Sequence, residues 1–205
     1  MSFFKRLRRS IGNNVDIHKT QTTKSDSDAI FSLSSAYITL ESKLGLKSTG
    51  RCAICVKNVN TSDFSEMQQY IQNFLSTAMK TDFDISFNTS IDNYGYLWVV
   101  LSGKTIEGIV AAINAVGDTI NEKGFSNQLL AAVFELTSGY NTLYLIYNYK
   151  IDKFYPFVPI ERRGGGGGQR RRNNEEEIKI MEAISNEIPF EKNLSLWYPI
   201  WDLPI

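Results

Sequence analysis

The sequence contains one histidine, His18, and two cysteines, Cys52 and Cys55, among its 205 residues. A nucleophile activated by histidine needs the imidazole beside it, and a tetrahedral zinc site needs four ligands, usually Cys or His. His18 lies in a polar stretch outside the predicted core, so it supports neither kind of site. No glycine-rich loop runs into the Lys-Ser or Lys-Thr of a phosphate-binding motif. We therefore predict a protein without catalytic residues, metal or cofactor.

Long apolar runs and an excess of one charge sign are also missing. The 22 basic and 22 acidic side chains balance, so the chain as a whole has no general attraction to nucleic acid or to an anionic membrane. No run approaches the roughly 20 apolar residues that a membrane-spanning helix needs. The scarce cysteines, and the lack of an apolar stretch after the basic start, lead us to expect a cytoplasmic protein.

Cys52 and Cys55 have the C-x-x-C spacing of redox pairs and of half zinc sites. Residues 51–56, however, are predicted to form a strand that is apolar on both faces. Side chains three residues apart on a strand point to opposite faces. We therefore expect two inert core cysteines.

The first twelve residues are predicted to form a short amphipathic helix. Apolar side chains share one face and basic side chains occupy the rest: Phe3, Phe4, Leu7 and Ile11 against Lys5, Arg6, Arg8 and Arg9. This pattern is typical of helices that lie among lipid headgroups. We expect residues 1–12 to contact an anionic membrane surface or a protein partner, with packing on the chain's own domain or a frayed terminus as the alternative. Residues 13–27 are polar and are predicted to form a linker.

Residues 28–160 are predicted to form one α+β domain. After a first helix with a clear helical period, residues 51–136 read as strand, helix, strand, strand, helix, strand. This is the βαββαβ, ferredoxin-like order. We expect an antiparallel sheet, extended by a further hairpin around residues 138–139 and by a short edge segment at residues 154–158. The two later helices should cover one face, and the first helix should lie at an edge or on the open face.

An Arg/Gly-rich stretch at residues 161–174 includes five consecutive glycines and is predicted to be a flexible tether. Residues 175–205 follow as a helix and an aromatic segment that contains Trp197, Tyr198, Pro199 and Trp201. Aromatic side chains contribute most when they are buried. We therefore expect this segment to dock on the main domain, with recognition of a partner as the alternative.

A nucleic-acid-binding module is the alternative function, using the sheet face and the Arg/Gly tether. Tyr96 and Trp98 lie on a strand with a faint likeness to the aromatic strand of RNA-binding domains. The leading basic residue and the second small residue of that motif are missing, so we expect both rings in the core. Nucleic acid is not the partner we expect.

Seven blocks of the sequence carry a family resemblance: residues 1–12, 34–41, 61–64, 92–101, 129–134, 155–157 and 197–201. In this order and spacing they resemble the archaeal PspA-associated protein PspAB family. The resemblance implies a non-catalytic accessory protein of a PspA-type membrane-stress response. It implies a PspA-like or HtpX-like partner and a place at the inner face of the cell membrane. It brings no established active site, and nothing in the sequence indicates the oligomeric state.

Overall fold

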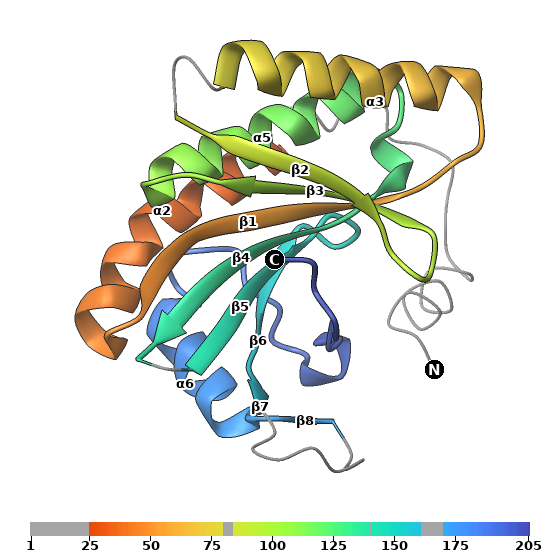
Figure 1. Cartoon of the computed structure of the whole chain (residues 1–205). Helices are drawn as coiled ribbons and strands as arrows, with labels where there is room; N and C mark the ends of the chain where they lie inside the picture. Colours follow the sequence, from red (N-terminus) through yellow and green to blue (C-terminus); the bar gives the residue numbers. More distant parts are fainter. Residues whose placement is uncertain (1–24, 80–83, 140, 161–169) are drawn as a thin grey trace.

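The computed structural model describes residues 25–79, 84–139, 141–160 and 170–205. These residues form one six-stranded sheet with helices packed on one of its faces (Figure 1). The strand order is β2-β3-β1-β4-β5-β6, and every neighbouring pair is antiparallel. The predicted α+β class and the antiparallel sheet are confirmed.

The strands follow the alternation and the apolar runs of the sequence. Their bounds are β1 Lys47–Lys57, β2 Ser86–Ile91, β3 Tyr96–Ser102, β4 Leu129–Ser138, β5 Asn141–Asn148 and β6 Lys153–Phe157. The central strands β1 and β4 are buried on both faces, which explains why each reads as a continuous apolar run. A small second sheet pairs β7 Pro159–Ile160 with β8 Arg171–Arg172.

The helices are α2 Ser25–Leu44, α3 Ser62–Phe74, α5 Ile106–Glu122 and α6 Asn174–Ile184. Three of them begin at a polar cap: Thr61, Thr105 and Asn173 each accept a hydrogen bond from a backbone N–H in the first turn. In the sequence, Asp63 followed by Glu66 has the spacing of a capping box and predicts a helix start at Asp63. The cap is instead Thr61, whose hydroxyl accepts from Phe64 N–H.

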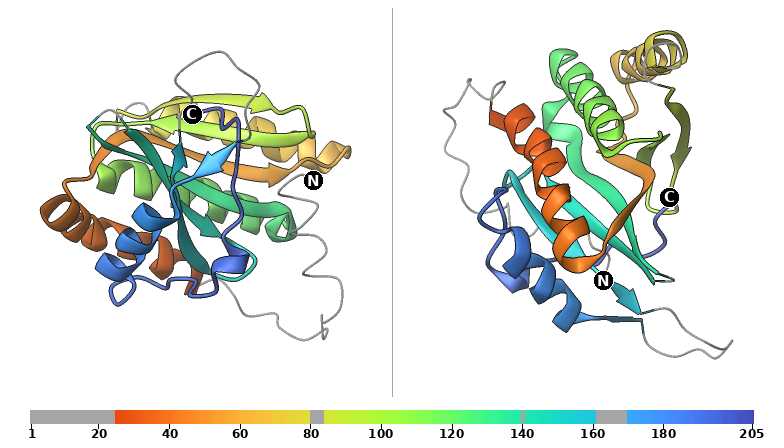
Figure 2. Two further views of the ribbon diagram at one scale, coloured as in Figure 1. Left: turned by 90° about the horizontal axis from the view of Figure 1, so that it is seen from below. Right: turned by 90° about the vertical axis from the view of Figure 1, so that its left-hand side faces the viewer.

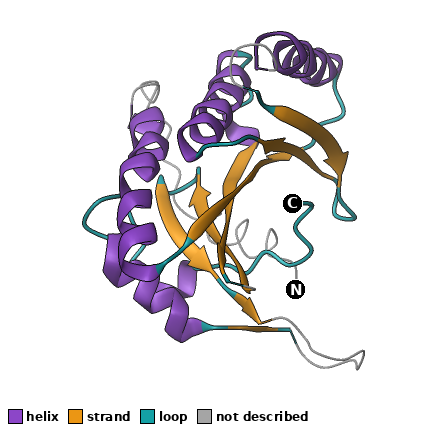
Figure 3. Cartoon of the chain, turned by 60° about the vertical axis from the view of Figure 1, so that its left-hand side comes forward, coloured by secondary structure: helices purple, strands orange, loops and turns teal. Residues whose placement is uncertain are grey.

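All four helices lie on the same side of the sheet (Figure 3). Helix α5 packs on β1 and on α2, and α2 also packs on α6. The position expected for the first helix, at an edge or on the open face, is therefore wrong. One helix is about 10 Å across, so α5 cannot cover all six strands. Helices α2 and α6 cover the part of the sheet that α5 leaves.

The opposite face of the sheet is crossed by the last residues of the chain (Figures 2 and 3). Tyr155 on β6 donates a hydrogen bond from its hydroxyl to the Tyr198 carbonyl at 3.2 Å. The ring of Trp201 meets the edge of Phe157 with centroids 4.9 Å apart. The face that the sequence analysis called open is therefore covered at β6.

Two predicted boundaries change. Helix α2 begins at Ser25, inside the predicted linker of residues 13–27. Residues 170–174 were predicted to belong to the tether, yet Arg171 and Arg172 pair with Ile160 and Pro159, and Asn173 caps α6. The glycine run itself lies outside the described residues.

Gly50 lies in β1 where the register with β4 shifts between Ser48 and Cys52. Its φ is +77°, and an added Cβ would lie 2.1 Å from the Gly103 carbonyl oxygen. Gly45 ends α2 with a similar φ of +65°, but no atom lies within 4 Å of its Cβ position. A side chain at either position would therefore strain the backbone, but only at Gly50 would it also collide with a neighbouring atom.

We predict that Gly45→Ala lowers the free energy of unfolding by about 1 kcal/mol, the strain of a left-handed alanine. Gly50→Ala should cost clearly more, because the backbone of Gly103 must also move. Urea denaturation of both variants measures the difference. Equal losses would show that the close approach of Gly50 to Gly103 does not constrain the sheet.

Candidate functional site

The residues predicted to contact a membrane or a partner, Phe3 to Ile11, lie outside the described residues. Their role stays a prediction. The four predicted docking residues of the C-terminal segment are all described.

Trp197 is 5% exposed, and its indole N–H donates to the Glu191 carbonyl at 2.8 Å. Its ring also meets Phe190 edge-on, with centroids 5.9 Å apart. Tyr198, Pro199 and Trp201 are half-buried. A partner that recognised these rings would first have to separate them from contacts within the chain.

The charged stretch after the tether holds this segment through one ion pair, which the sequence analysis did not find. The Arg172 guanidinium donates from Nε to both carboxylate oxygens of Glu177, at 2.9 and 2.8 Å. Its other nitrogens donate to the carbonyls of Trp197, at 2.6 Å, and Pro156, at 3.3 Å. Arg172 therefore joins β6, α6 and the aromatic segment.

In the sequence, Glu177 is the last of three consecutive glutamates, a pattern that predicts a solvated face, but its side chain is only 1% exposed. Besides Arg172, it accepts a hydrogen bond from Val158 N–H at 2.8 Å. Burial raises the pKa of Glu177, and the hydrogen bonds from Arg172 and Val158 offset part of that rise. The Glu177 carboxylate is therefore a buried charge that depends on the Arg172 guanidinium.

The same C-terminal segment also provides hydrogen-bond partners for the backbone groups on the outer edge of β6. Phe154 N–H donates to the Pro189 carbonyl and Glu191 N–H donates to the Phe154 carbonyl, both at 2.8 Å. Pro156 has no N–H to offer. An edge strand left open is a template for another chain, and this edge is closed along its length.

The two cysteines are buried and lie on opposite faces of β1. Cys52 lies under α5, with Sγ 3.8 Å from the Ile109 carbonyl oxygen, whereas Cys55 pairs with Trp98 on the other face. Burial raises the pKa of both thiols, and the Asp92 carboxylate adds to the effect at Cys55. Neither thiol is poised for nucleophilic or redox chemistry.

The structure buries one of the two rings that the nucleic-acid alternative would use. Tyr96, which was also expected in the core, is half-buried. Trp98 is 1% exposed, and its indole N–H donates to the Asp92 carboxylate at 2.9 Å. A buried ring cannot stack on a base. Arg172, at the end of the Arg/Gly stretch, is engaged by Glu177.

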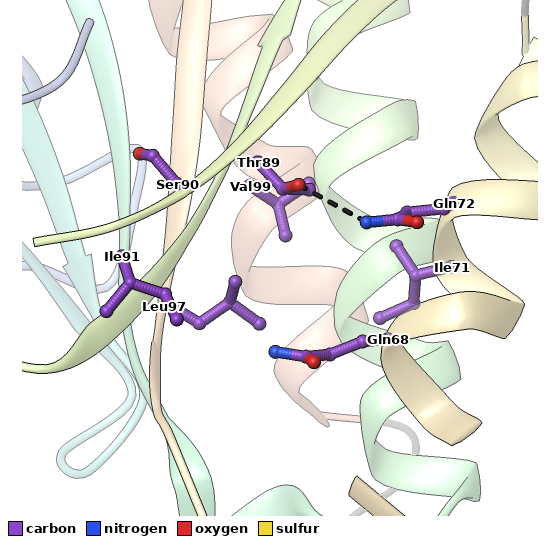
Figure 4. Close-up of a pocket in the computed structure, with 8 residues that line it drawn as sticks. All are labelled: Gln68, Ile71, Gln72, Thr89, Ser90, Ile91, Leu97 and Val99. Carbon is purple, nitrogen blue, oxygen red and sulfur yellow. Dashed lines mark hydrogen bonds between the residues drawn. The ribbon is translucent and has the colours of Figure 1, made fainter. Parts of the chain in front are cut away.

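The opposite edge of the sheet carries the site that we favour, the α3–β2 groove (Figure 4). It is a cavity of about 250 Å³ between α3 and the edge hairpin. Its lining residues come from α3, β2 and β3: Gln68, Ile71, Gln72, Thr89, Ser90, Ile91, Leu97 and Val99. None of these residues is charged.

The groove has an apolar floor and a polar rim. Leu97, Val99 and Ile71 are each at most 5% exposed and form the floor. Gln72 spans the opening and donates to the Thr89 hydroxyl at 3.3 Å. Ile91 is 59% exposed at one end. This lining offers burial to apolar side chains and hydrogen bonds to uncharged polar groups, and it holds no group suited to acid–base chemistry.

In the sequence, Ile71 falls on a helix of amphipathic period and Thr89 and Ile91 fall on an alternating strand. Neither pattern gives the distance between the two elements, so the groove could not be predicted from them. A weak signal was present. Helix α3 carries glutamines at positions 68 and 72, next to its apolar stripe, where a fully packed helix would carry apolar side chains.

Among the described residues, no helix combines the length and apolarity needed to cross a membrane. In the same part of the chain, no three His, Cys, Asp or Glu side chains gather as a metal site.

A family model described as PspA associated protein B matches residues 1–205. The chain belongs to this family. The match covers the whole chain, including the aromatic segment and the residues of the groove. Comparison with curated proteins and comparison with solved structures found no match. The name of the PspAB family implies an association with PspA, and the chemistry of the protein must be inferred from its own residues.

The Arg172–Glu177 pair gives a test of the C-terminal segment in this PspAB protein. We predict that Arg172→Met lowers stability at neutral pH by about 3–5 kcal/mol, because it leaves a buried carboxylate without its cation. The pKa of Glu177 should then lie further above its unfolded value. The folded state would bind an extra proton between the two pKa values, so stability should rise as pH falls from neutral toward about 5.

Urea unfolding at the two pH values measures this dependence. The control is Arg171→Met, which removes the same charge from the exposed neighbouring position. It should change stability little at either pH. If Arg172→Met behaved like this control, the pair would not hold the segment.

Proposed function

We propose that this PspAB-family protein is a non-catalytic accessory protein that binds a PspA-type protein through the α3–β2 groove. The observation that carries the proposal is the groove itself, a described cavity with an apolar floor at a surface that no other described segment covers. The aromatic C-terminal segment is engaged within the chain. The groove is therefore the better candidate contact.

The groove specifies the chemistry of the partner segment. Its floor of Leu97, Val99 and Ile71 favours one or two apolar side chains, and its rim of glutamine, threonine and serine favours amide or hydroxyl groups. Because no charged residue lines it, the contact should depend little on salt. A PspA-type segment with an apolar stripe flanked by uncharged polar residues would fit.

We propose that the membrane surface is the place of this contact. The basic and apolar side chains of residues 1–12 support this part of the proposal, as does the association with PspA that the family name implies. The HtpX-like partner implied by the resemblance stays a prediction.

We also infer that β1, β2, β3 and β4 with α3 and α5 form a ferredoxin-like unit. The strand order β2-β3-β1-β4 with antiparallel neighbours supports this inference. In this unit β5 and β6 are additions, and β2 is an edge.

We predict that Gln68→Trp weakens binding to the PspA-type protein of the same cell by about tenfold or more, equivalent to about 1.4 kcal/mol. The indole would occupy the space that the partner's apolar side chain needs. Isothermal titration with the two purified proteins measures the dissociation constant.

Gln69→Trp is the matched control, because Gln69 is the next residue of α3, is exposed and does not line the groove. It should bind like the wild type. Unchanged binding by both variants would show that the PspA-type protein does not bind in the groove. Absence of binding by the wild type would reject the proposed function.

A further inference from the structure

The outer edge of β2 differs from the outer edge of β6. No described residue pairs with it, whereas β6 is closed by the chain's own C-terminal segment. Edge strands usually carry a charge, a proline or a bulge that blocks further pairing. The residues of β2, Ser-Phe-Asn-Thr-Ser-Ile, include no charge and no proline. Its pairing with β3 runs without a register shift.

We propose that a second copy of this chain pairs with β2, antiparallel, about a two-fold axis at Thr89. The two sheets would then join into one continuous sheet. An unpaired strand edge offers a row of N–H and C=O groups, and another extended strand satisfies these groups. Two-fold symmetry supplies such a strand with the same unblocked edge.

The axis position follows from which face each side chain occupies. Phe87, Thr89 and Ile91 pair with Leu101, Val99 and Leu97, so they lie on the helix face. In a dimer with the helices on one side, paired residues must share a face. Centring the axis on Thr89 satisfies this condition and pairs Phe87 with Ile91 of the partner subunit.

This register also covers the apolar surface of the edge. Ile91 is 59% exposed and Phe87 is half-buried. Opposite each other they form an aromatic–β-branched pair, a combination that stabilises antiparallel strands. On the other face, Asn88 would meet Ser90 of the partner subunit, where both can hydrogen-bond.

Charge favours a second copy of the same chain. The formal net charge is zero at pH 7, so two copies do not repel each other as a whole. No charged residue lies on β2, so the axis brings no like charges together. Strand pairing uses the backbone groups of the edge, but the side chains of Thr89 and Ile91 at this seam also line the groove. The dimer is therefore tested by the oligomeric state alone, and partner binding is tested separately by the Gln68 variant.

The first test is the oligomeric state of the full chain by sedimentation equilibrium. We expect a dimer. Thr89→Lys and Thr89→Glu each place like charges at the axis and should weaken dimerisation about tenfold or more. An equimolar mixture of the two variants should restore it, because opposite charges then meet at the axis. That restoration also shows that both variants fold.

Ile38→Lys is the control, since Ile38 is 69% exposed on α2, away from β2. It should remain dimeric. A monomeric wild type would overturn the proposal, as would a dimer that both Thr89 variants leave intact. The proposal would also be overturned if β2 paired with a strand of a different protein and never with β2 of a second copy.

A cross-link tests the register. Directly opposed residues of an antiparallel pair have Cα atoms about 4.5–5.5 Å apart, within the range of a disulfide. Thr89→Cys should therefore form a covalent dimer with oxidised glutathione, because the native cysteines are buried. Ser90→Cys, which lies opposite Asn88 of the partner subunit, should cross-link much less. Equal yields would contradict the axis at Thr89.

Discussion

The ion pair of Arg172 with Glu177 connects the parts of this fold that come last in the chain. Arg172 also donates to carbonyls of β6 and of the aromatic segment, and Glu177 also accepts from Val158 N–H. Both groups are largely shielded from water, so removing either one leaves a buried charge without its counter-ion and destabilises the fold. Together with the packing of α6 on α2 and β6, this pair attaches the segment after the glycine run to the sheet.

The two edges of the sheet differ, because the β6 edge is closed by described residues of the same chain and the β2 edge is not. One edge is sealed by hydrogen bonds to residues 173–191, so further strands cannot be added there. The other edge, β2, keeps its backbone groups available within the described structure, and the α3–β2 groove opens beside it. Recognition by this PspAB-family protein should therefore concentrate at the α3 and β2 side.

Local patterns were enough to predict the elements but not the contacts between distant ones. Alternation and apolar runs located all six strands of the main sheet, and the helical period located the four helices. The starts of α2, α3 and α6 were misplaced by a few residues. Arg172 and Glu177 read as solvated charges, because nothing nearby in sequence shows that β6 and the aromatic segment enclose them. The groove depends on the distance between α3 and β2, which sequence periodicity does not contain. The position of α2 also depended on space left by α5.

The most direct test of this account is amide hydrogen exchange at Phe154 and Val158. Their N–H groups point out of the sheet toward the Pro189 carbonyl and the Glu177 carboxylate. If the C-terminal segment is integral to the fold, both amides should open only with global unfolding, with the same free energy as amides of β1. If they exchange as fast as unprotected edge amides while β1 stays protected, the segment is loosely attached and the account is wrong.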